Sequence, residues 1–212
     1  MGLRQAQPAV TEFVEVSPSP PHLVTLPPAF PSFPTPLVGR SQALAEIDAH
    51  LQRPGARLLT LVGPGGMGKT RLAVEVGRAR MTTFADGVFF VPLAHISTSV
   101  ALSAAIATAF GITLQSGDPR SALFQTVRQK HLLLILDNFE QLLTEGAAAI
   151  DLVVDLLDAA PLIQIIVTSR ERLKLRSEQL YAVQALTFAT TATLAEAAAS
   201  AAVRLFVQAV QQ

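Results

Sequence analysis

A glycine-rich loop between an apolar segment and an amphipathic one constrains the fold of this chain most. The loop, residues 63–70, reads Gly-Pro-Gly-Gly-Met-Gly-Lys-Thr and fits the phosphate-binding pattern G-x-x-x-x-G-K-[ST]. Residues 57–62 before it are largely aliphatic, which is typical of a buried parallel strand. Residues 69–80 after it place apolar side chains on one helical face. The sequence therefore predicts a strand, a phosphate-binding loop and a helix, in that order.

The residue types of this loop suit an anionic ligand. Glycine lets the backbone approach a ligand closely, and the start of the following helix offers unpaired N–H groups with a partial positive charge. We expect Lys69 to reach the β- and γ-phosphates of a nucleotide and Thr70 to offer its hydroxyl to Mg²⁺. With the adjacent Arg71, the predicted nucleotide-binding residues here are Gly63, Pro64, Gly65, Gly66, Met67, Gly68, Lys69, Thr70 and Arg71.

The composition of the 212 residues excludes several classes of function. The chain has no cysteine, so it forms no disulfide, thiol nucleophile or cysteine-ligated metal site. Its formal net charge is zero, which predicts no general attraction to nucleic acid or to an anionic membrane. The first residues lack the apolar core of a secretory signal, and the strongest apolar run, residues 132–136, is too short to cross a bilayer. We expect a soluble cytoplasmic protein.

Proline usage divides the chain. Residues 1–36 contain nine of the fourteen prolines, which predicts an extended or disordered linker. Residues 37–186 alternate strand and helix patterns, which predicts an α/β fold with a parallel sheet covered by helices on both faces. An alanine-rich segment, residues 187–212, contains a predicted helix at about 194–211.

The expected elements follow from hydrophobic periodicity and from helix-capping residues. Ser41 is the expected N-cap of the first helix, and Asp118 with Pro119 begins a later one. Strands are expected at 57–62, 87–93, 132–136, 163–168 and 179–183. Helices are expected at 41–51, 69–80, around 102–110, after 118, at 140–145, at 147–159 and, as a short piece, at 171–175. This is a P-loop NTPase arrangement with a five-stranded parallel sheet.

Acidic and amide side chains follow the third strand. Asp137 ends an apolar run, so it is expected to hold Mg²⁺ together with Thr70; alternatively it caps the next helix. The next residue, Asn138, can position a water molecule by hydrogen bonds but is no general base. Glu140 could orient the attacking water, or it could be a first-turn acid favoured by the helix dipole. We therefore expect slow hydrolysis of a bound nucleotide.

A basic residue follows the fourth strand. Because ligands of parallel sheets lie at the carboxyl ends of the strands, Arg170 is expected to approach the γ-phosphate and respond to its presence. The alternative assigns Arg170 to a solvated basic run with Arg172, Lys174 and Arg176.

With these residues in view, the chain resembles the STAND class of P-loop ATPases, especially the NB-ARC-like "predicted ATPase" modules of bacterial multidomain transcriptional regulators. The blocks that carry the resemblance are residues 36–40, 59–73, 87–93, 133–142 and 166–173. The resemblance implies that Val38, Gly39 and Arg40 lie near the adenine and ribose. Residues 63–70 would be its Walker A motif, Asp137 its Walker B acid and Arg170 its sensor 1.

The same resemblance implies a switch between ADP and ATP, with Mg²⁺, that works with protein partners or with further C-terminal domains. Residues 187–212 would be the first helix of an incomplete helical lid, as in a fragment or a truncated gene product. Preference for adenine over guanine rests on this resemblance. Three other functions stay open: a nucleotide-holding module without hydrolysis, an AAA+-like ATPase acting with nucleic acid, and a small-molecule kinase, which is disfavoured because no second-substrate pocket is readable.

Overall fold

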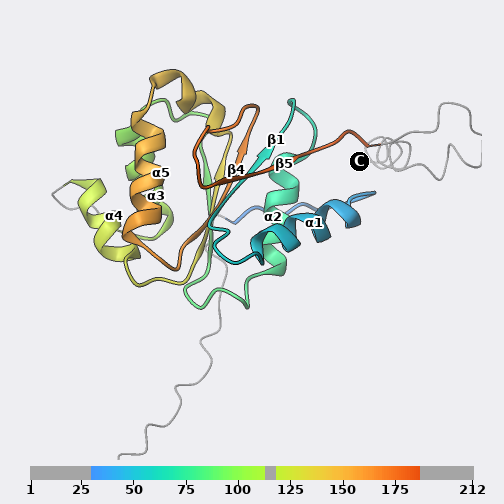
Figure 1. Cartoon of the computed structure of the whole chain (residues 1–212), viewed down its shortest axis with the longest axis horizontal. Coiled ribbons are helices and arrows are strands. Elements are labelled where there is room, and N and C mark those ends of the chain that lie inside the picture. Colours follow the sequence, from blue (N-terminus) through green and yellow to red (C-terminus); the bar gives the residue numbers. More distant parts are fainter. Residues whose placement is uncertain (1–29, 113–117, 187–212) are drawn as a thin grey trace, which may run out of the picture.

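Five parallel strands form one sheet in the order β2-β3-β4-β1-β5 (Figure 1). The computed structural model describes residues 30–112 and 118–186. Its elements are α1 (Ser41–Leu51), β1 (Leu58–Val62), α2 (Lys69–Ala79), β2 (Val88–Pro92), α3 (Ser99–Ala109), α4 (Pro119–Val127), β3 (Leu133–Asp137), the 3₁₀-helix η1 (Phe139–Glu145), α5 (Ala148–Ala159), β4 (Gln164–Ser169) and β5 (Glu178–Ala182). The predicted five-stranded parallel sheet is confirmed.

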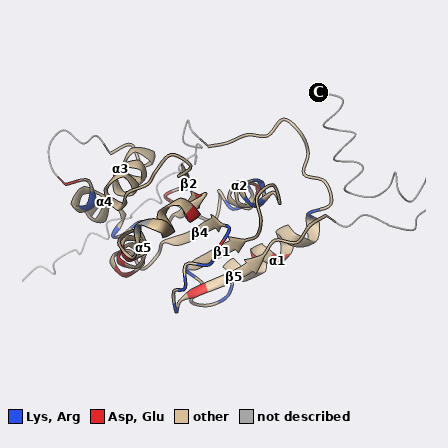
Figure 2. Ribbon diagram, turned by 90° about the horizontal axis from the view of Figure 1, so that it is seen from above, with Lys and Arg blue, Asp and Glu red and all other residues tan. Residues whose placement is uncertain are grey.

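Helices cover both faces of this sheet, as predicted. Helices α3, α4 and α5 lie on one side, and α1 and α2 lie on the other (Figure 2). Strand β3 is buried on both faces: Leu134 and Leu136 pack toward the first group of helices, whereas Leu133 and Ile135 pack toward the second. This explains its uninterrupted aliphatic run, because a central parallel strand has no solvent-facing side.

One close approach fixes α2 on the sheet. A Cβ placed on Gly77 of α2 would lie 2.7 Å from Cδ1 of Ile135 and 3.1 Å from Cγ1 of Val88. The missing side chain therefore lets α2 sit directly against β2 and β3, which holds the helix that follows the glycine-rich loop.

Two predicted helix details are wrong. Arg40, not Ser41, is the N-cap of α1, and no side chain caps this end. The Arg40 guanidinium instead binds the carbonyl oxygens of Met67 and Gln184, which fixes the residue before the helix. Residues 171–175 form no helix: Lys174 has a left-handed φ of 63°, and the carboxylate of Glu178 accepts the backbone N–H groups of Leu173 and Lys174 in a turn.

Part of the proline-rich segment lies against the domain. Phe30 packs edge-on against Phe90 with ring centroids 6.4 Å apart, and Arg78 of α2 donates to the carbonyl oxygen of Pro31 at 2.9 Å. Residues 1–29 and the predicted helix at 194–211 lie outside the described residues. The linker and lid assignments therefore stay predictions.

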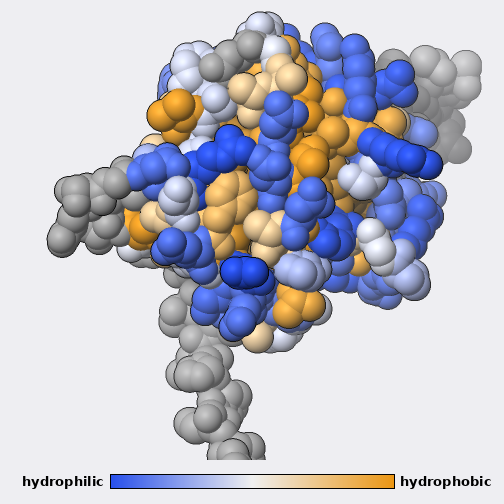
Figure 3. Space-filling view, turned by 60° about the vertical axis from the view of Figure 1, so that its left-hand side comes forward, coloured by the Kyte–Doolittle hydropathy of each residue, from blue (hydrophilic) through white to orange (hydrophobic). Residues whose placement is uncertain are grey.

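The surface mixes polar and apolar side chains. Figure 3 shows apolar residues in orange between hydrophilic residues in blue over one face of the molecule. Among the described residues the large exposed apolar side chains are Val100, Leu162 and Leu180, which come from separate parts of the chain. Single exposed apolar side chains are normal on a protein surface.

Asp86 joins the turn before β2 to the start of β3. Its carboxylate pairs with Lys130 at 2.7 Å and accepts the backbone N–H of His131 at 2.8 Å. Although burial opposes the charged form, these hydrogen bonds hold the pKa of Asp86 below its ordinary value. A depressed folded-state pKa stabilises the protein above the unfolded-state value, about 3.9, and this contribution is lost as the pH falls through the folded-state pKa.

We therefore expect Asp86→Asn to lower the free energy of unfolding by about 1 kcal/mol at pH 7. The difference from the wild type should shrink as the pH falls from about 3.9 to pH 3 and below, because the unfolded chain takes up its proton first and folded Asp86 follows as the pH passes its lowered pKa. Urea unfolding at the two pH values measures this effect. An equal difference at pH 7 and pH 3 would show that the charge of Asp86 contributes nothing.

Candidate nucleotide-binding site

The glycine-rich loop joins the carboxyl end of β1 to the first turn of α2. Gly66 and Gly68 adopt φ angles of 77° and 85°, a left-handed region that glycine enters without steric cost. Gly68 is the N-cap of α2 and no side chain caps this end, so Lys69 and Thr70 begin the helix at the border of a cavity. The predicted strand, loop and helix thus occur where the sequence places them, and the start of α2 offers N–H groups to an anion.

Lys69 is folded back onto its own loop. Its ammonium donates to the carbonyl oxygens of Gly63 at 2.8 Å and Pro64 at 2.9 Å, and the residue is only 9% exposed. Burial lowers the pKa of Lys69, the charge of Glu140 raises it, and that of Arg170 lowers it. The side chain is therefore a buried cation whose present partners are neutral carbonyl oxygens.

Three oxygen-bearing side chains meet at the ends of α2, β3 and β4. The hydroxyl of Thr70 donates to Oδ1 of Asp137 at 2.7 Å, and the hydroxyl of Thr168 donates to the same oxygen at 2.5 Å. Asp137 is 6% exposed. The N-cap of the following helix η1 is Asn138, so the alternative role of Asp137 as a helix cap has no support in this geometry.

The donor set at this point fits Mg²⁺. Hydroxyl and carboxylate oxygens are the hard ligands that Mg²⁺ prefers, and in nucleotide sites one or two carboxylates suffice because phosphates and water complete the shell. The described residues contain no group of three or more His, Cys, Asp and Glu that could hold a metal alone. Thr70 and Asp137 are thus suited to share a cation with a phosphate ligand.

The residues after β3 and β4 face the same cavity. Asn138 has φ 64° and ψ 46°, a left-handed conformation that asparagine tolerates better than most residues. Its backbone N–H donates to the Thr168 hydroxyl at 3.0 Å. Oε1 of Glu140 lies 3.2 Å from Nε of Arg170. The predicted hydrolysis and sensor residues therefore gather beside the loop, with Glu140 and Arg170 joined to one another.

This phosphate-side cavity has a volume of about 290 Å³. It is lined by Phe33, Gly65, Gly66, Gly68, Lys69, Thr70, Arg71, Asn138, Glu140, Thr168 and Arg170. Phe33 and Thr168 are not among the site residues that the sequence predicts. The sequence could have indicated Thr168, because it is a polar residue at the end of a predicted apolar strand. No sequence pattern indicates Phe33, since it lies in the proline-rich segment and reaches the cavity only through the tertiary fold.

A second cavity of about 190 Å³ also borders the loop. Val38 and Arg40 line it together with Leu37, Gly66, Met67, Gly68, Arg71, Ala185 and Leu186. The Arg40 guanidinium donates to the Gln184 carbonyl oxygen at 2.6 Å and to that of Met67, which lines this cavity, at 2.9 Å. Two of the three residues predicted to lie near the base, Val38 and Arg40, thus lie next to the glycine-rich loop.

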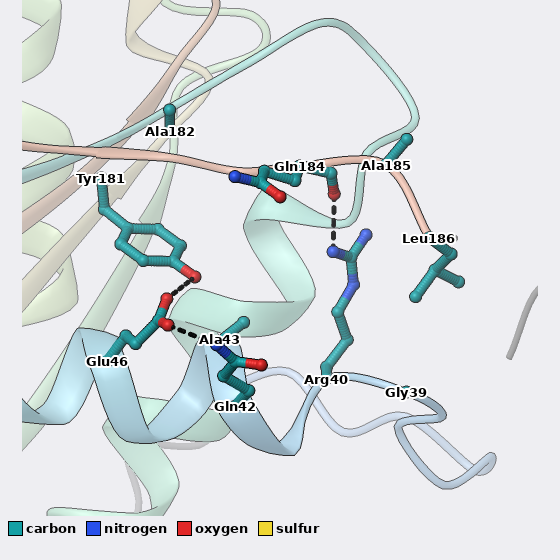
Figure 4. A pocket seen from close by; sticks show the side chains of 10 residues that line it. All are labelled: Gly39, Arg40, Gln42, Ala43, Glu46, Tyr181, Ala182, Gln184, Ala185 and Leu186. Carbon is teal, nitrogen blue, oxygen red and sulfur yellow. Dashed lines mark hydrogen bonds between the residues drawn. The ribbon is translucent and has the colours of Figure 1, made fainter.

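Gly39 belongs to a third pocket, between the start of α1 and β5 (Figure 4). There Glu46 accepts hydrogen bonds from Tyr181 at 2.9 Å and from Gln42 at 2.8 Å. Burial, with the neighbouring Glu46, raises the pKa of Tyr181 to about 12. Its phenol therefore stays protonated at neutral pH and acts as a hydrogen-bond donor that joins β5 to α1.

Arg71 is directed toward the N-terminal segment. Its guanidinium donates to the hydroxyl of Thr35 at 3.0 Å and lies over the ring of Phe33, 5.2 Å from the centroid. It still lines both cavities beside the loop. Arg170, by contrast, lies over the loop itself, with Nη2 3.7 Å from the position of a Cβ on Gly65.

Comparison with known protein families agrees with this geometry. The family described as "AAA domain" matches residues 52–176, more than half of the chain. The chain therefore belongs to the AAA domain family, and its fold is that of a P-loop NTPase. Among the described residues, no helix is both long and apolar enough to cross a membrane.

Two mycobacterial relatives are similar in sequence. A protein of Mycobacterium tuberculosis whose name assigns it to the HTH-type transcriptional regulators is 42% identical over 123 residues, which cover 58% of this chain and 13% of that protein. A second M. tuberculosis protein, named only as uncharacterized, is 33% identical over 159 residues, covering 74% of this chain and 39% of that protein. The chain thus spans a minor part of both relatives.

Solved structures share the fold. The ORC1 protein of Aeropyrum pernix, determined in complex with DNA, aligns with a TM-score of 0.56 and 21% identity over 76% of this chain and 48% of that one. At this identity the likeness concerns the fold alone. A STAND protein of Pyrococcus horikoshii with a tetratricopeptide repeat sensor aligns over 71% of this chain and 23% of that one, with 16% identity and a TM-score of 0.44, too low to bear on function.

Proposed function

We propose that this chain is the nucleotide-binding module of a STAND-type signalling ATPase, which binds ADP and ATP with Mg²⁺ and hydrolyses ATP slowly. The observation that carries the proposal is the 2.7 Å contact of the Thr70 hydroxyl with the Asp137 carboxylate, directly beside Lys69. The NB-ARC-like sequence blocks and the regulator name of one relative support the signalling role.

Binding would use groups that the fold already positions. The N–H groups at the start of α2 suit the phosphates, because they are unpaired and carry a partial positive charge. Lys69 can exchange its two carbonyl partners for phosphate oxygens, which are stronger acceptors. The base and ribose would occupy the neighbouring cavity beside Val38 and Arg40.

Slow hydrolysis follows from the residues around Asp137. A Mg²⁺ ion held by Thr70 and Asp137 would supply charge neutralisation for the phosphates. Asn138 can orient a water molecule through its amide but cannot accept the proton. The Glu140 carboxylate is paired with Arg170, so it is not free to act as a base while that pair persists. This chain thus retains triphosphate for long periods, as a switch requires.

Phosphate release from Mg²⁺-ATP by the purified chain tests the proposal. We expect a turnover below about 0.1 s⁻¹, under the range of ordinary enzymes. Tight binding of ADP and ATP without any release would favour a module that holds nucleotide without hydrolysing it. Faster turnover that depends on added DNA and weakens with salt would overturn the signalling role in favour of an ATPase acting with nucleic acid.

A further inference from the structure

We propose that Glu140 sets the preference of this site between nucleoside di- and triphosphate, by holding Arg170 until a third phosphate takes its place. This inference rests on the proposed nucleotide binding and adds the group that discriminates the two ligands. The Glu140–Arg170 ion pair, called the latch below, joins the residues after two neighbouring strands. Both of its members line the phosphate-side cavity.

The position of the latch is fixed by the sheet. Glu140 lies in η1, which starts two residues after β3 ends, and Arg170 comes directly after β4. Strands β3 and β4 pair with one another, so their carboxyl ends bring the two side chains to one edge. The latch is therefore a consequence of the fold, and its Arg170 side chain lies over the loop that would hold the first phosphates.

The two side chains differ in how free they are to move. The Arg170 side chain is 65% exposed, whereas that of Glu140 is 17% exposed. Oε2 of Glu140 is buried with no hydrogen-bond partner among the described residues. A carboxylate that lacks full solvation gains from a nearby cation, so Glu140 retains Arg170 unless a stronger anion competes.

Arg170 is also within reach of a phosphate. The latch engages its Nε atom, while Nη2 lies over Gly65 of the loop. A phosphate group accepts the planar guanidinium through two parallel hydrogen bonds, which a single Nε contact to a carboxylate cannot match. A triphosphate extends one charged group further than a diphosphate, so it alone would compete with Glu140 for Arg170.

Discrimination follows from this competition. The loop and Lys69 offer the same contacts to both ligands, and contacts shared by two ligands cannot distinguish them. Breaking the latch opposes the binding of triphosphate only. Glu140 therefore lowers the affinity for ATP relative to ADP, and a neutral residue of the same shape at this position should remove that bias.

We expect Glu140→Gln to strengthen ATP binding about 3- to 10-fold, the range of a partly exposed ion pair, and to leave ADP binding within about twofold. Arg170→Ala should weaken ATP binding and leave ADP binding nearly unchanged. Calorimetric titration of ATP and ADP with Mg²⁺ measures both ratios. Glu171→Gln is the matched control, because it removes an exposed acid next to Arg170 that lies outside the cavity.

The double variant separates the latch from general electrostatics. If Glu140 acts through Arg170, then Glu140→Gln has no effect on the ATP-to-ADP ratio in the Arg170→Ala background. The role proposed for the latch would be wrong if the ratio shifts equally in both backgrounds, or if ATP and ADP binding change together. Neither result would contradict the proposed nucleotide binding. A wild-type chain that binds neither nucleotide would overturn the proposed function itself, and the latch with it.

Discussion

Lys69→Ala is expected to weaken the binding of both ADP and ATP by about 100-fold or more, since charge-assisted hydrogen bonds to phosphate contribute roughly 1.5–3 kcal/mol each. The reason is the position of the ammonium group. It is buried beside the loop, and its hydrogen bonds within the described part of the chain go to the neutral carbonyl oxygens of Gly63 and Pro64. Its removal deletes the cation that the phosphates would meet.

The matched control for this prediction is Lys130→Ala. Lys130 precedes β3, so it lies at the opposite end of the strands from the loop, and it pairs with Asp86. This variant removes an equal charge, so a nonspecific electrostatic effect would appear in both. Equilibrium titration with fluorescent ADP measures the two dissociation constants. Affinity retained within about threefold in Lys69→Ala would contradict the assigned role.

Asp137→Asn is expected to abolish the effect of Mg²⁺ on ATP binding and to reduce phosphate release by about 100-fold or more, as the loss of a transition-state charge partner does. Asparagine has nearly the same shape and can still accept from Thr70 or Thr168, so the fold should persist. Its amide cannot provide the negative charge that a divalent cation requires.

Titration of ATP with Mg²⁺ and with a chelator measures this prediction. The wild type should bind more tightly with Mg²⁺, whereas the variant should show no difference. Thr70→Ser, which keeps the hydroxyl, should behave as the wild type, and Thr70→Val, which removes it at similar volume, should behave as Asp137→Asn. An undiminished Mg²⁺ effect in Asp137→Asn would mean that the cation is held elsewhere.

The parts of this fold that depend on local patterns could be predicted from the sequence. The loop of residues 63–70 is readable because its glycines, its lysine and the flanking periodicities are contiguous. The first four strands follow from short apolar runs, whereas the fifth, Glu-Gln-Leu-Tyr-Ala, has a weaker pattern; the parallel arrangement follows from the alternation with helices. The helix expected at 171–175 does not form for a local reason: Lys174 has a left-handed φ of 63°, and Glu178, four residues further on, accepts the backbone N–H groups of Leu173 and Lys174.

In the candidate site, too, some features follow from local sequence patterns and others depend on how side chains pack. Strand ends of a parallel sheet meet at one edge, so the sequence could bring Asp137 and Arg170 toward the loop. It could not predict that Glu140 pairs with Arg170, because both residues had separate roles available and only their side-chain directions decide between them. The sequence could not predict the hydrogen bond from Arg71 to Thr35 either, because that bond depends on where the proline-rich segment packs.

The most direct test of the central claim is calorimetric titration of the intact chain with Mg²⁺-ADP, Mg²⁺-ATP and Mg²⁺-GTP. We predict one site per chain, with both adenine nucleotides bound and GTP bound more weakly. Binding of GTP as tight as that of ATP would contradict the STAND-type assignment, but not the phosphate-binding role of the loop. A folded chain that binds none of the three nucleotides would contradict the proposed function of the site.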